Sequence, residues 1–191
     1  MVTERDSSVI VAKQLFLREY NPMRTIENAM DKSINASVSR NDTYASHTKD
    51  WQRGMVKDFW SKQVIDISAK YATQVQTKET FDNDIMFLKR IMNETYGELF
   101  EGSNFKISHA QKSLSVYLKH LWCMRLSLVP PRCPVDRQIL KVAGAPQNMI
   151  PWTEVDDIKI YRGHCNLLAQ KANVEKFENV ACWELVKFSP Q

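Results

Sequence analysis

The chain of 191 residues is long enough to bury a sizeable core without disulfides or a metal ion. Its 43% hydrophobic and 25% charged residues are ordinary for a globular protein, and only 5 glycines argue against a turn-rich all-β fold. The net charge of +4 is mild, and no apolar run approaches the roughly 18 residues that a transmembrane helix needs. The N-terminal stretch MVTERDSSVIVAKQ has acidic residues and no long apolar core, so we expect no signal peptide, no membrane partner and a cytoplasmic, intracellular location.

Apolar residues recur at helical intervals throughout the first half of the chain. This spacing predicts four helices, the first of which is capped by Ser7 or Ser8. Thr48 and Thr80 are the predicted caps of the third and fourth helices, and Gly97 lies near the predicted end of the fourth. The apolar positions are, in chain order, Ala12, Leu15, Phe16 and Tyr20; Ile26, Met30 and Ile34; Trp51, Met55, Phe59, Ile67 and Tyr71; and Phe81, Ile85, Leu88, Met92 and Tyr96.

The second half begins with a predicted amphipathic helix over residues 108–126. Its apolar face carries Leu114, Leu118, Leu121 and Trp122, and its other side carries Lys112, Lys119 and His120. Pro130, Pro131 and Pro134 then predict an extended turn, because proline disrupts a helix interior. A short helix over 135–142 follows, then a long helix that we expect Thr153 and Asp156 to cap, and a final helix over 177–188.

These elements predict an all-α fold. We expect a compact domain of about seven to eight helices with no substantial sheet, because no segment longer than SSVIVA has a strand-like composition. We treat residues 1–191 as a single helical domain that could divide into two lobes, residues 1–100 and 101–191. Trp122 and Trp183 lie on apolar helix faces and are expected in the core.

Positive charge is concentrated in one segment, residues 103–144. This segment contains one acidic residue, Asp136, and seven basic residues: Lys106, Lys112, Lys119, Arg125, Arg132, Arg137 and Lys141. Such a segment attracts anionic partners, either nucleic acid or an acidic protein. The candidate contacts to nucleic acid are Lys106, Lys119, Arg125, Arg132 and Arg137. The alternative is that these charges only keep a helix surface hydrated.

The cysteines and histidines do not predict a metal centre. Cys123, Cys133, Cys165 and Cys182 form no CxxC pair, and we expect them to be reduced and buried. His120 and Cys123 lie one helical turn apart, but structural zinc sites use tighter pairs of ligands. We therefore expect no metal and no cofactor.

Residues 112–188 resemble the catalytic half of the helix-hairpin-helix DNA glycosylases, and most of all the archaeal-type 8-oxoguanine glycosylase/lyases. In that family a lysine near the start of an amphipathic helix is followed by a short element with an Asp-Arg pair, a loop, a long helix and a short final helix. The matching segments here are QKSLSVYLKHLW, PVDRQILK, WTEVDDIKIYRGHCNLLAQKANVEKF and ENVACWELVKF. The residues FKISHAQK, which lead up to Lys112, lack the glycines of the family's hairpin.

The resemblance implies that Lys112 is a nucleophile and that Asp136 is its partner. In such enzymes a deprotonated lysine amine attacks the sugar and displaces a damaged or modified base, which must first be extruded from the duplex. Tyr117, Trp122 and Trp152 are candidates to stack on that base. Catalysis and a structural role for Asp136 are compatible, since its position after Pro134 also predicts a helix N-cap.

Two functions from different classes remain open on the sequence. One is a DNA glycosylase/lyase with Lys112 and Asp136 as its catalytic residues. The other is a non-catalytic helical protein that uses residues 103–144 to bind nucleic acid or an acidic partner, with Lys112 as an ordinary surface lysine. The distance between the Lys112 amine and the Asp136 carboxylate separates the two, because catalysis requires both groups in one pocket.

Overall fold

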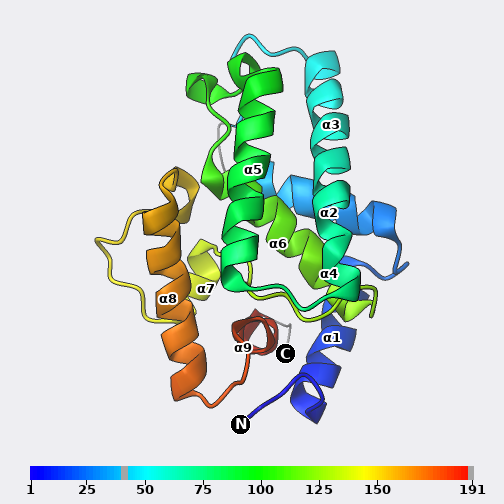
Figure 1. Ribbon diagram of the computed structural model, residues 1–191, viewed down its shortest axis with the longest axis vertical. Coiled ribbons are helices and arrows are strands. Elements are labelled where there is room, and N and C mark those ends of the chain that lie inside the picture. The colour runs from blue at the N-terminus through cyan, green and yellow to red at the C-terminus, as the bar shows by residue number, and fades with distance from the viewer. Residues whose placement is uncertain (40–42, 189–191) are drawn as a thin grey trace.

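The computed structural model describes residues 1–39 and 43–188, and within these residues most of the chain is helical (Figure 1). The α-helices are α1 (Ser7–Tyr20), α2 (Ile26–Val38), α3 (Asp50–Ser68), α4 (Lys70–Thr73), α5 (Lys78–Tyr96), α6 (Ile107–Cys123), α7 (Arg137–Val142), α8 (Ile158–Val174) and α9 (Val180–Phe188). Three 3₁₀ turns are η1 (Gly97–Leu99), η2 (Glu101–Ser103) and η3 (Trp152–Glu154).

The predicted all-α fold is confirmed. Helices α3 and α4 are separated only by Ala69, which has helical backbone angles (φ −54°, ψ −40°), so together they form one helix. Counted in this way, the described residues form eight α-helices. They contain isolated β-bridges between Val2 and Phe177 and between Tyr44 and Phe100, but no strand and no sheet. No helix in this part of the chain has the length and apolar character needed to cross a membrane.

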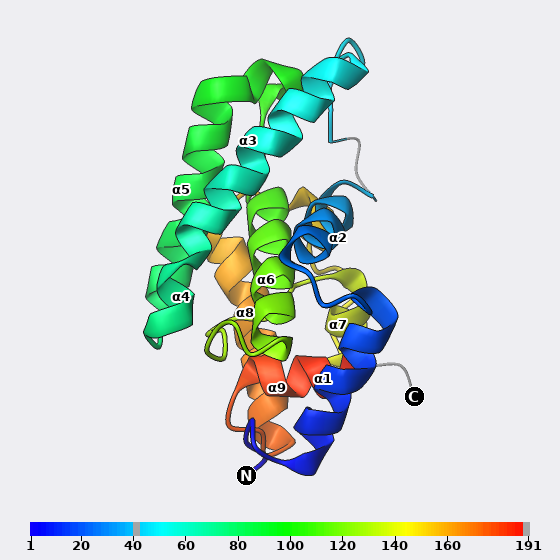
Figure 2. The same cartoon turned by 90° about the vertical axis from the view of Figure 1, so that its right-hand side faces the viewer.

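Helix α6 lies in the middle of the fold and packs against α1, α2, α3 and α5 (Figure 2). Every residue of α6 except Val116 is buried. The expectation that Lys112, Lys119 and His120 lie off the buried face is therefore wrong: α6 is surrounded on all sides, so its polar side chains are inside the protein. Each of these groups must find its partner in the interior.

Small side chains allow α2 to pack closely along α6. Ala29, Ser33 and Ser37 recur every four residues on α2 and are all buried. The two serine hydroxyls donate hydrogen bonds to carbonyl oxygens of the preceding turn of α2, at 2.9 Å each from Ser33 to Ala29 and from Ser37 to Ser33. Because both hydroxyls make their hydrogen bonds within α2, they can lie against α6 without hydrogen-bond partners on that helix.

The helix caps differ in part from those predicted. The cap of α5 is Thr77, whose Oγ1 accepts a hydrogen bond from the Thr80 amide, so Thr80 lies inside the first turn. Asp157 caps α8, and the expected pair of Thr153 and Asp156 does not form a capping box. The Asp156 carboxylate instead reaches the start of α6, where it accepts a hydrogen bond from the Ile107 amide at 3.1 Å.

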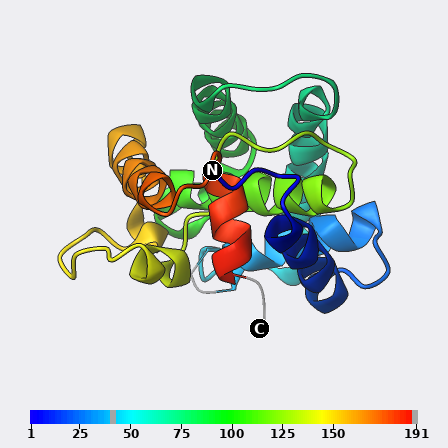
Figure 3. The same cartoon turned by 90° about the horizontal axis from the view of Figure 1, so that it is seen from below.

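The final helix closes the lower end of the fold, where α9 contacts both α1 and α8 (Figure 3). The hydrophobic core includes residues from both halves of the chain. Trp122 and Trp183 are 2% and 0% exposed, which confirms their predicted burial.

We expect replacement of Trp183 by Ala to lower the free energy of unfolding by about 3–5 kcal/mol, because it removes a large, fully buried side chain and leaves a cavity. Trp51 is the matched control, since it is 62% exposed and Trp51→Ala should change stability by less than about 0.5 kcal/mol. Urea unfolding followed by circular dichroism measures both. Equal losses in the two variants would contradict a core role for Trp183.

Candidate active site

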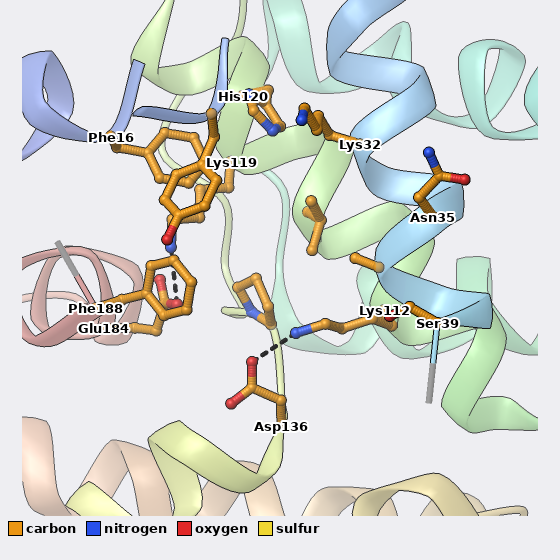
Figure 4. A pocket seen from close by; sticks show the side chains of 14 residues that line it. Phe16, Lys32, Asn35, Ser39, Lys112, Lys119, His120, Asp136, Glu184 and Phe188 are labelled. Carbon is orange, nitrogen blue, oxygen red and sulfur yellow. Dashed lines mark hydrogen bonds and ion pairs between the residues drawn. The ribbon is translucent and has the colours of Figure 1, made fainter. Parts of the chain in front are cut away.

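Lys112 and Asp136 form a direct ion pair in the interior. Lys112 extends from the second turn of α6, and Asp136 is the N-cap of α7 (Figure 4). The Lys112 Nζ atom lies 2.6 Å from Asp136 Oδ2, and the two side chains are 9% and 14% exposed. The other carboxylate oxygen, Oδ1, accepts a hydrogen bond from the Ile139 amide at 3.0 Å. Asp136 is therefore both the predicted helix cap and the partner of Lys112.

The surroundings of the pair keep Asp136 ionised. Burial acts to raise the pKa of Asp136, but the charge and hydrogen bond of Lys112, together with the Ile139 amide, lower it below its ordinary value. The Trp152 ring lies on another side of the lysine, with its centroid 5.5 Å from Nζ. An ammonium group between a carboxylate and an aromatic face is favourably placed in this interior.

A second buried ion pair lies two turns along α6. Lys119 Nζ is 2.8 Å from Glu184 Oε1 on α9, and these side chains are 4% and 2% exposed. The Lys119 amine also lies 4.6 Å from the ring centroid of Phe16 and 4.0 Å from that of Phe188. Burial raises the pKa of Glu184 above its ordinary value, although Lys119 acts to lower it.

Both ion pairs line one pocket of about 290 Å³, which is partly open to solvent. Its walls come from α1, α2, α6, α9 and the turn before α7. The lining residues are Phe16, Tyr20, Lys32, Asn35, Ala36, Ser39, Lys112, Val116, Lys119, His120, Pro134, Asp136, Glu184 and Phe188. The volume is near the lower end of the range for small-molecule sites, about 300–1,000 Å³. Aromatic walls with two charged pairs suit a small, flat and polar ligand.

The five predicted nucleic-acid contacts have different surroundings. Arg125 and Arg137 are exposed and Lys106 is half-buried, so all three are accessible. Lys119 is held inside by Glu184, and Arg132 binds both carboxylate oxygens of buried Asp82, at 3.2 and 2.9 Å. Both side chains are thus held in buried ion pairs: Lys119 lines the pocket, and Arg132 anchors the turn before α7 to Asp82.

The start of α6 does not form a phosphate-binding hairpin. The amides of three successive residues there already have acceptors within the protein: Lys106 donates to His109 Nδ1, Ile107 to Asp156 Oδ1 and Ser108 to the Val155 carbonyl. The Asp156 carboxylate is in turn bound by Lys89 and Asn104. An anion at this helix end would have to displace a carboxylate that is already in place.

Most of the residues in the pocket wall were not predicted from the sequence. Of the aromatic residues expected to stack on a base, Tyr117 and Trp122 are core residues that do not line the pocket, and Trp152 contacts Lys112 instead. The Phe and Tyr rings that do line it, those of Phe16, Tyr20 and Phe188, come from α1 and α9, near the two ends of the chain. Their only signal in the sequence is helical spacing, which cannot tell a core residue from a pocket residue.

Comparisons with protein-family models, with curated proteins and with solved structures each found no match to this chain. The candidate site therefore stands on its own geometry. Across residues 1–39 and 43–188, no group of three or more His, Cys, Asp or Glu side chains is placed to hold a metal ion.

His120 at the pocket wall makes stability depend on pH. Burial, with help from the charges of Lys119 and Lys32, lowers the pKa of His120 from 6.5 to about 3. Between these values the unfolded chain binds a proton that the folded chain does not, so the stabilisation is complete above pH 6.5 and is lost as the pH falls toward 3.

We expect His120→Leu to be less sensitive to acid than the wild-type protein. Its free energy of unfolding relative to wild type should improve by about 1.4 kcal/mol for each pH unit below 6.5. Urea titrations at several values between pH 7 and pH 5 measure the difference. Burial also lowers the pKa of His109, to about 4. Because His109 is present in both proteins, its contribution cancels in the difference between their free energies of unfolding. Parallel pH profiles would mean that folded His120 accepts its proton normally.

Proposed function

We propose that this protein is a DNA glycosylase/lyase that removes a damaged or modified base, with Lys112 as the nucleophile and Asp136 as its partner. The observation that carries this function is the 2.6 Å contact between Lys112 Nζ and Asp136 Oδ2 at the wall of a pocket. The resemblance of residues 112–188 to the helix-hairpin-helix glycosylases supports it independently, because it was drawn from sequence motifs and selects the same two residues.

The reaction assigns one step to each member of the pair. Asp136 lies at hydrogen-bond distance from the Lys112 amine and is the group placed to accept its proton. The freed amine attacks C1′ of the deoxyribose, and the glycosidic bond breaks as the base leaves with its electron pair. The base takes up the proton that Asp136 had accepted, which restores the carboxylate, and a proton of the attached nitrogen moves to the ring oxygen O4′ as the C1′–O4′ bond breaks. The sugar ring then opens to a Schiff base on Lys112, and the Asp136 carboxylate faces the resulting positive charge.

The pocket offers a site for the extruded base. The rings of Phe16 and Phe188 provide apolar surface for a flat heterocycle, and base-aromatic stacking contributes about 1–3 kcal/mol per base. Lys119 and Glu184 present a hydrogen-bond donor beside an acceptor in the same wall. A base whose edge carries a carbonyl next to an N–H matches that order of groups.

A non-catalytic protein that binds nucleic acid or an acidic partner through residues 103–144 is the weaker alternative. Of the seven basic residues in that segment, Lys112, Lys119 and Arg132 are neutralised in buried ion pairs. The surface charge that remains is modest. It is better suited to holding a substrate near the pocket than to forming an interface by itself.

We expect borohydride to trap the wild-type protein covalently on a duplex with a suitable damaged base, because hydride reduces the Schiff base to a stable amine. Lys112→Ala should abolish trapping, and Asp136→Asn should slow it by about 100-fold or more while keeping an acceptor for the Ile139 amide. Lys62→Ala, at an exposed lysine of α3 that does not line the pocket, is the lysine control and should trap normally. Since breaking a buried ion pair destabilises by about 3–5 kcal/mol, circular dichroism must first show that each variant is folded. Failure of the wild-type protein to trap on a broad panel of lesions would overturn the proposed reaction.

We also expect exposed basic residues beside the site to contact DNA phosphates. Lys32 lines the pocket, and Arg137 directly follows Asp136. Replacing either by Ala should weaken binding to all sequences alike and flatten the slope of log affinity against log salt by about 1, because one phosphate contact and its released counterion are lost. Lys62→Ala on α3, also exposed, should leave the slope unchanged. Fluorescence anisotropy at several salt concentrations tests this, and equal slopes in all four proteins would exclude these contacts.

A further inference from the structure

The Gln111 side chain connects the two chain segments that carry the catalytic pair. Gln111 is 1% exposed and lies immediately before Lys112 on α6. Its Nε2 donates to the Val135 carbonyl at 2.9 Å, and its Oε1 accepts from the Val135 amide at 3.2 Å. Val135 immediately precedes Asp136. The amide of one side chain thus satisfies both backbone groups of the residue next to the carboxylate.

Little else in the backbone fixes this segment. Within the described part of the chain, residues 129–135 make no backbone–backbone hydrogen bond, since three prolines interrupt the segment and it belongs to no helix or sheet. Arg132 attaches the middle of the turn to Asp82. At the end that bears Asp136, the two hydrogen bonds from Gln111 set the distance between the turn and α6.

We infer that Gln111 is a positioning residue that holds the Asp136 carboxylate against the Lys112 amine, a role that rests on the function proposed above. Gln111 is adjacent to Lys112, and Val135, to which it is hydrogen-bonded, is adjacent to Asp136. A shift of the turn relative to α6 would therefore change the distance between Lys112 Nζ and Asp136 Oδ2. A displacement of about 1 Å in a catalytic group is enough to lower a rate by about 100-fold.

Gln111→Met tests this inference, because methionine has a similar length and fills the space without making either hydrogen bond. Ser113→Ala is the matched control. Ser113 is buried on the same helix and equally close in sequence to Lys112, but its hydroxyl accepts a hydrogen bond from Trp60 Nε1, at 3.0 Å, and donates to carbonyl oxygens within α6. Both variants remove a buried hydrogen-bonding group, so any effect of general destabilisation should appear in both.

With enzyme in excess over DNA, we expect Gln111→Met to form the borohydride-trapped adduct roughly 10–100-fold more slowly than wild type, with DNA affinity changed by less than about threefold. Ser113→Ala should trap within about threefold of the wild-type rate. A Gln111→Met protein that is folded and traps at the wild-type rate would overturn the positioning role. If the wild-type protein itself does not trap, the proposed function fails and this role falls with it.

A second measurement follows the geometry without using the reaction. Lys112 contributes to lowering the pKa of Asp136. Loss of the two hydrogen bonds between Gln111 and Val135 should therefore raise the midpoint of the Asp136 titration toward its ordinary value. An NMR titration of the side-chain carboxyl carbon reports that midpoint. We expect an upward shift in Gln111→Met and none in Ser113→Ala. An unchanged midpoint in Gln111→Met would show that the pair keeps its contact without Gln111 and would overturn the inference.

Discussion

The fold is organised around two lysine ammonium groups buried on its central helix. Removing such a charge from water costs several kcal/mol even after the protein relaxes, so each ammonium group requires a carboxylate at close range. Lys112 obtains Asp136 from the turn before α7, and Lys119 obtains Glu184 from α9. The paths of the proline-rich turn and of the final helix are therefore both tied to α6. The pocket is the space that remains where these segments and α2 meet.

Stability alone gives little reason for this arrangement. Apolar side chains of similar volume in place of a buried ion pair are often neutral or stabilising, by about 1–4 kcal/mol. Two such pairs lie along one face of one helix and line the same pocket, which is the arrangement that the proposed reaction would require. A further network, in which buried Arg132 and partly exposed Arg162 both bind Asp82, lines a separate and much smaller hollow through Arg132 and anchors the turn.

The features that could be predicted from the sequence are those that depend on residues close together in the sequence. Helical spacing predicted the all-α fold, and the position of Asp136 after Pro134 predicted its role as a cap. The pairing of Lys112 with Asp136 was reached through motif resemblance, although 24 residues separate them. The burial of Lys119 was not predicted, because helical periodicity describes one helix and does not reveal that others surround it. Glu184, Phe16 and Phe188 reach the pocket from distant parts of the chain, and Asp156 caps α6 rather than its own helix.

The resting ion pair also explains how one carboxylate can serve several stages of the proposed reaction. Before attack, Asp136 faces an ammonium group; after the sugar ring opens, it faces the positively charged Schiff base on the same nitrogen. Between these stages the amine is neutral, and it then faces the uncharged carboxyl group of Asp136 that holds its proton. The Asp136 carboxylate therefore stabilises the ammonium group before the attack and the protonated Schiff base after it. The neutral amine exists only while Asp136 holds its proton. A carboxylate held rigidly by the Ile139 amide, and by Gln111 through Val135, would meet both cations without having to move.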